Sequence, residues 1–91
     1  MLHIVPWFRP EDYEAIRAAV PDDPTLVASY QEWLEAANKV VAKVEALGRR
    51  RVVKAIIDPK KFTAWCDAAG VDYNTASLGA FAVVAGSKQQ N

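Results

Sequence analysis

The sequence contains one cysteine, one histidine and one methionine among its 91 residues, and these scarcities exclude several kinds of chemistry. Because Cys66 is alone, no disulfide can form within the chain, and a reducing cytoplasm is the simplest expected location. Because His3 is alone, the sequence offers no histidine cluster for a metal and no histidine pair for acid-base catalysis. We therefore expect no disulfide, no metal site and no cofactor.

Long hydrophobic runs are also absent. The longest uncharged stretch, residues 73–87, is shorter than the roughly 18 apolar residues that a membrane span requires, and it contains two glycines and several polar residues. Residues 1–10 lack the basic start and apolar run of a signal peptide. We expect no membrane association.

The net charge is zero, but the charges are unevenly distributed along the chain. Residues 1–48 carry eight acids and four bases, whereas residues 49–91 carry seven bases and three acids. Such polarity can be internally complementary, can pair two copies, or can attract an anion. Ordinary solvated surface is the simplest interpretation.

The composition is that of a folded chain, with 52% hydrophobic and 24% charged residues, and the length suits a single domain over residues 1–91. The strongest pattern is an amphipathic helix from Pro24 to Leu47, with Asp23 as its N-cap and Gly48 as its left-handed C-terminal cap. Spacings of three and four residues predict one buried face, made of Leu26, Tyr30, Trp33, Leu34, Ala37, Val40, Val41, Val44 and Leu47.

Two short segments are predicted to be strands. Residues 2–5 favour β structure and are expected to end at Pro6, and residues 51–58 form a basic strand that follows the long helix. Both faces of the second strand are largely apolar. Either helices cover both faces, or a second copy extends the sheet into a four-stranded homodimer.

Three further helices are expected. One begins after Pro10 and turns Tyr13, Ile16 and Val20 to one side. Another covers residues 60–69, points Phe62, Trp65 and Cys66 inward, and ends at Gly70. The last covers residues 75–85, begins at the N-cap Asn74, and buries Leu78, Phe81, Ala82 and Ala85. We expect close packing at Gly79 and a flexible tail over residues 86–91.

These elements predict a small α+β domain in the order strand, helix, helix, strand, helix, helix. The two-stranded sheet is packed by the long helix and by a C-terminal helical hairpin.

The leading functional hypothesis is a protein-interaction module that uses an exposed sheet edge and two aromatic residues, with self-association as one form of that interaction. Trp7 and Phe8 lie between two prolines in an extended segment, where exposed aromatic side chains would suit a partner-binding surface. They are the candidate partner-binding residues.

The alternative is nucleic-acid binding. The segment 49–61 supplies basic side chains, and the hairpin 62–85 resembles the turn of DNA-binding helix-turn-helix proteins. The second helix of that hairpin offers only Asn74, Thr75 and Ser77 to bases. The candidate anion-binding residues are Arg49, Arg50, Arg51, Lys54, Lys60 and Lys61.

Catalytic residues are not identified. His3 is expected to be a packed or surface residue of a strand, and Cys66 a small buried hydrophobe. The sequence predicts a non-enzymatic protein.

The segment from Asp58 to Cys66, together with Gly70 and residues 77–82, resembles short uncharacterised bacterial proteins. The resemblance covers about residues 58–82 and implies a bacterial, cytoplasmic protein of unknown function, with no cofactor or catalytic residue attached.

Overall fold

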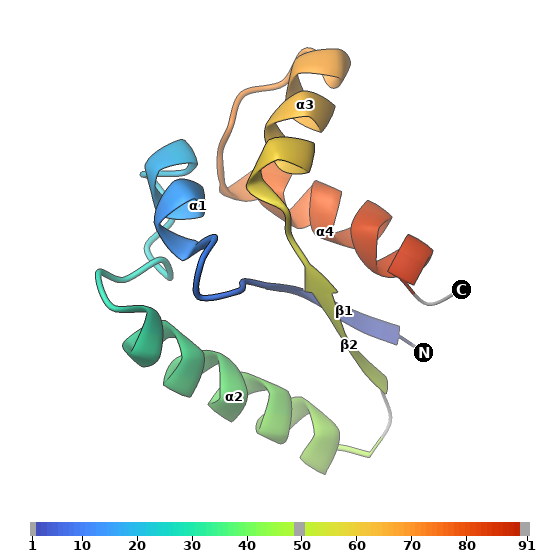
Figure 1. Ribbon diagram of the computed structural model, residues 1–91. Coiled ribbons are helices and arrows are strands. Elements are labelled where there is room, and N and C mark those ends of the chain that lie inside the picture. Colours follow the sequence, from blue (N-terminus) through green and yellow to red (C-terminus); the bar gives the residue numbers. More distant parts are fainter. Residues whose placement is uncertain (1, 49–50, 90–91) are drawn as a thin grey trace.

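The computed structural model describes residues 2–48 and 51–89, and this part of the chain forms two strands and four helices (Figure 1). Their order confirms the predicted α+β fold. The elements are β1 (Leu2–Trp7), α1 (Tyr13–Ala19), α2 (Tyr30–Ala46), β2 (Arg51–Ile56), α3 (Pro59–Ala69) and α4 (Thr75–Gln89).

The two strands are parallel, in a register that runs from Leu2 opposite Arg51 to Trp7 opposite Ile56. The prediction that Pro6 ends the first strand is wrong. The Ile57 N–H donates to the Trp7 carbonyl at 3.0 Å, so Trp7 faces β2 and the preceding proline faces away. The missing N–H of Pro6 therefore removes no bond from the ladder.

Helices cover both faces of this sheet. On one face, α4 lies against both strands, and a Cβ built on its Gly86 would meet Ile4. On the other face, Trp33 of α2 packs edge-on against Trp7, with ring centroids 5.1 Å apart. Figure 1 shows the sheet between these two helices. Both apolar faces of β2 are thus covered by helices of the same chain. The homodimer stays a prediction.

The long helix begins later than predicted, because two local signals compete at its start. The Asp23 carboxylate accepts bonds from the N–H and hydroxyl of Thr25, at 2.9 and 2.6 Å, and so closes a turn instead of capping a helix. Ser29 is the true N-cap, and its hydroxyl accepts from the Glu32 N–H. The pattern Ser-x-x-Glu at residues 29–32 is a capping-box signature.

The buried stripe of α2 is narrower than predicted. Trp33 and Val41 are buried, but Val40 is 53% exposed and Leu47 71% exposed, so both predictions of burial are wrong. A sheet of two strands is too narrow to cover the whole apolar face of a 17-residue helix. Leu26 is buried as expected, although it lies in the loop before α2.

The predicted buried faces of α1, α3 and α4 are confirmed, apart from Trp65 of α3, which is half-buried. Gly48 and Gly70 both have φ of +69°, as their left-handed caps require. The buried residues of these faces are Tyr13, Ile16, Val20, Phe62, Cys66, Leu78, Phe81, Ala82 and Ala85.

Close packing in α4 occurs at Gly86 and not at Gly79, where it was predicted. Gly79 is exposed, and a Cβ there would meet nothing within 4 Å, so the predicted close packing is wrong. Gly86 is buried, and a Cβ there would lie 2.6 Å from Cγ2 of Ile4. Residues 86–89 continue α4, so the tail predicted from residue 86 does not begin there.

Candidate functional site

The predicted pair Trp7 and Phe8 lies mostly inside the molecule. Phe8 is 2% exposed and packs against Tyr13 and Trp33, so the expectation that it is exposed is wrong. Trp7 is half-buried, and the Lys54 ammonium lies 4.4 Å from the centroid of its ring. The segment after β1 turns inward because the Phe8 ring packs against Tyr13 and Trp33, and because the Tyr30 hydroxyl donates to the Phe8 carbonyl.

These rings form an aromatic cluster made of Trp7, Phe8, Tyr13, Tyr30 and Trp33. Its two hydroxyls are satisfied by backbone carbonyls: Tyr13 donates to Val27 at 2.6 Å and Tyr30 donates to Phe8 at 2.9 Å. Burial raises the pKa of the Tyr13 phenol. The cluster therefore holds β1, α1, α2 and the loop before α2 together, as a core does.

The described basic residues of the alternative hypothesis lie on two elements, β2 and α3. Lys54 lies over Trp7 on the α2 side of the sheet, whereas Lys61 lies in the first turn of α3. Arg51 and Lys60 are exposed. Arg49 and Arg50 lie outside the described residues.

The hairpin of α3 and α4 also differs from a DNA-reading motif. The Asn74 side chain accepts from the Ser77 N–H, and the Ser77 hydroxyl accepts from the Asn74 N–H, both at 2.9 Å. This reciprocal cap confirms Asn74 as the N-cap and uses two of the three side chains that could contact bases, since Thr75 takes no part in it. The apolar side of α4 is buried on the sheet, so nothing here favours base recognition.

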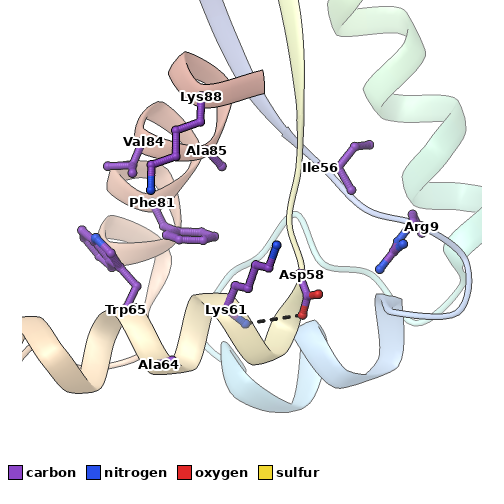
Figure 2. A pocket seen from close by; sticks show the side chains of 10 residues that line it. All are labelled: Arg9, Ile56, Asp58, Lys61, Ala64, Trp65, Phe81, Val84, Ala85 and Lys88. Carbon is purple, nitrogen blue, oxygen red and sulfur yellow. Dashed lines mark hydrogen bonds between the residues drawn. The ribbon is translucent and has the colours of Figure 1, made fainter. Parts of the chain in front are cut away.

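The site that the sequence did not reveal is a groove where the carboxyl ends of the two parallel strands meet α3 and α4 (Figure 2). We call it the basic groove, and its volume is about 600 Å³, within the usual range of ligand pockets. Its lining consists of Arg9, Ile56, Asp58, Lys61, Ala64, Trp65, Phe81, Val84, Ala85 and Lys88.

One side of the groove is formed by two aromatic rings. Trp65 and Phe81 are in contact, with ring centroids 5.6 Å apart. Phe81 is buried, whereas Trp65 is half-buried and is drawn beside the groove (Figure 2). The sequence predicted both residues as core, because helical spacing does not tell a buried ring from one at the wall of a groove.

The rim carries three cations and one acid. Arg9 pairs with Asp12 at 2.6 Å, and its pKa is raised by that hydrogen bond and by the charge of Asp12. Asp58 caps α3 by accepting from the Lys60 N–H at 2.9 Å and, more weakly, from the Lys61 N–H. Neither Lys61 nor Lys88 forms an ion pair with a described residue, so these two lysines supply the uncompensated charge.

This arrangement can bind a ligand. Among the described residues, Asp58 is the carboxylate that lines the groove, and its Oδ1 caps α3. Cys66 is fully buried, and the described residues contain no group of three or more histidine, cysteine or acidic side chains placed to hold a metal. Two aromatic rings beside two lysines that form no ion pair with a described residue fit an anionic ligand with an apolar body.

A scan of protein-family models, a search of curated proteins and a search of solved structures each returned no match to this chain. Within the described ranges, none of the helices has the length and apolarity needed to cross a bilayer.

Proposed function

We propose that the protein is an interaction module whose basic groove binds an acidic segment of a partner protein. The observation that carries the proposal is that Trp65 and Phe81 line one groove together with Lys61 and Lys88, neither of which forms an ion pair with a described residue. An acidic side chain of the segment pairs with the lysines, and a neighbouring large apolar side chain lies on the rings. Tryptophan is among the residues that dominate binding energy at interfaces, and charged side chains add specificity for a partner of opposite charge.

The location of the groove supports this assignment. In open sheets of parallel strands, ligands bind beyond the carboxyl ends of the strands, and Arg9 and Asp58 follow these ends directly. Compared with the hypothesis from the sequence, the binding role moves from Trp7 and Phe8, which belong to the aromatic cluster, to Trp65 and its neighbours.

A random peptide library displayed on phage and selected against the wild-type protein tests the proposal. Enriched peptides are expected to combine acidic residues with a large apolar residue. The double variant Lys61→Ala, Lys88→Ala is expected to bind these peptides at least about tenfold more weakly, because it removes both unpaired charges. Binding to the wild type is expected to weaken with added salt.

The matched control is Lys43→Ala, Lys60→Ala, which removes the same charge from two exposed lysines outside the groove. It is expected to bind the peptides almost as the wild type does. The proposal would be overturned if no peptide were selected, or if both double variants lost affinity for the peptides equally. Failure of the peptides together with binding of a single-stranded oligonucleotide would instead support nucleic-acid binding.

A further inference from the structure

The two edges of the sheet differ in their backbone chemistry. The N–H and C=O of one residue in a strand point to the same side, and that side alternates along the strand. Because the Ile57 N–H donates to the Trp7 carbonyl, Ala55 and Ile57 face β1, and Val52 and Lys54 face away from it.

The outer edge of β1 contains Pro6 near the carboxyl end of the strand, and this residue has no N–H to donate. The outer edge of β2 contains no proline, and no described residue supplies a hydrogen bond to the outward backbone groups of Val52 and Lys54. In Figure 1, β2 is the nearer strand and no other element is drawn in front of it. The edge of β2 can therefore accept a strand at Val52 and Lys54.

The basic groove begins at the carboxyl end of this edge. Ile56 lines it from the α2 side of β2, and Phe81, Val84 and Ala85 line it from the α4 side, so the strand itself lies between the two groups of side chains (Figure 2). A groove with walls on both sides of a strand gives access to the edge of that strand, not to one face of the sheet.

We infer that the partner's acidic segment binds as a third strand on β2 and extends into the basic groove. This inference rests on the proposed function and specifies its binding mode. Backbone hydrogen bonds to Val52 and Lys54 supply affinity, and the groove supplies specificity for acidic and apolar side chains, as in other complexes formed by strand addition.

Charge decides between an acidic partner and a second copy of this chain. Arg51 and Lys54 are exposed on β2, and Lys61 and Lys88 lie at its end. A second copy paired antiparallel through the same edge would place Lys61 and Lys88 of one copy near Arg51 of the other, which is unfavourable, whereas an acidic strand is attracted.

The variant Lys54→Pro tests the edge directly. It removes the outward N–H, as Pro6 does in β1, and leaves the bonds between the strands in place. Its matched control, Lys54→Ala, loses the same side chain and the same contact with Trp7 but keeps the N–H. Peptides selected on the wild type are expected to bind Lys54→Pro at least about tenfold more weakly than Lys54→Ala. Equal binding to two folded variants would overturn the inference.

N-methylated peptides give a test that does not depend on the folding of any variant. Methylation of alternate amides in one register blocks the bonds to β2, and methylation in the other register affects only amides that face away. Methylation in the first register is expected to abolish binding of the peptide, and methylation in the second register is expected to preserve most of the binding. Equal tolerance of both registers would overturn strand addition, whereas the proposed function fails separately, if the Lys61→Ala, Lys88→Ala variant keeps full affinity or if no peptide is selected.

Discussion

The aromatic cluster and the basic groove use the same kinds of residue for different purposes. Ring centroids in the cluster are as close as 4.9 Å, and Trp65 and Phe81 in the groove are 5.6 Å apart. In the cluster, the hydroxyls of Tyr13 and Tyr30 are bonded to backbone carbonyls, and Phe8, Tyr13 and Trp33 are buried. In the groove, Phe81 is buried and Trp65 is half-buried, and both rings line one open space together with Lys61 and Lys88. Ring geometry alone therefore does not distinguish a core from a binding surface; the distinguishing feature of the groove is that aromatic and basic side chains line the same open space.

The comparison predicts unequal stability losses from removing one ring in each region. Phe8→Ala is expected to lower the free energy of unfolding by about 3–5 kcal/mol, because the ring is 2% exposed in a packed cluster. Trp65→Ala is expected to cost about 1–2 kcal/mol, because its ring is only half-buried. Urea unfolding measures both values. A larger loss for Trp65→Ala would contradict the assignment of the cluster as core.

A second contrast concerns the packing of α4, the helix that forms one wall of the groove, against the sheet. Gly86→Ala is expected to destabilise the protein by about 1–3 kcal/mol, because the new methyl group would overlap Ile4. Gly79→Ala, in the same helix but exposed, is expected to stabilise it by about 1 kcal/mol. Thermal unfolding of both variants tests whether α4 is held on the sheet at Gly86. Similar shifts for the two variants would show that it is not.

A smaller effect is expected from the hydroxyl groups. Tyr13→Phe removes the buried bond to the Val27 carbonyl and is expected to cost about 0.5–1.5 kcal/mol. Tyr73→Phe removes a bond to the Asp67 carboxylate at the surface, at 2.6 Å, and is expected to change stability by less than about 0.5 kcal/mol. Chemical denaturation measures the loss of unfolding free energy in the two variants. A larger loss in Tyr73→Phe than in Tyr13→Phe would contradict the expectation that the buried hydroxyl contributes more.

Alkaline pH gives the smallest and most specific test. Burial raises the pKa of Tyr13 in the folded state above its unfolded value of about 10. The stability linked to this proton is fully present below about pH 10 and is lost as the pH rises through the folded pKa. Tyr13→Phe is therefore expected to flatten the loss of stability above pH 10. An unchanged slope would show that the Tyr13 phenol is not held protonated by the cluster.

Much of the fold could be predicted because local chemistry determined it. The face of α4 followed from the spacing of Leu78, Phe81 and Ala85, and the end of α3 followed from a glycine that adopts positive φ at residue 70. The start of α2 was predicted wrongly because Asp23 and Ser29 are both good caps, and propensity alone does not rank them.

The candidate site depended on tertiary structure. The parallel direction of the strands brings Arg9 and Asp58 to one end of the sheet, and no local pattern specified that direction. The burial of Phe8 likewise depends on Trp33, which is 25 residues later in the sequence. Signals that could have helped were the capping box at residues 29–32 and the single proline in β1, which marks an outward edge position.

The three tryptophans allow one direct measurement of the central claim, that the basic groove binds and the aromatic cluster supports the fold. Trp7 and Trp33 belong to the cluster, and Trp65 lines the groove. In a nuclear magnetic resonance titration with a peptide selected from the library, the indole N–H signal of Trp65 is expected to move farthest and that of Trp33 to remain in place. Movement of the Trp33 signal while the Trp65 signal stays fixed would contradict the account.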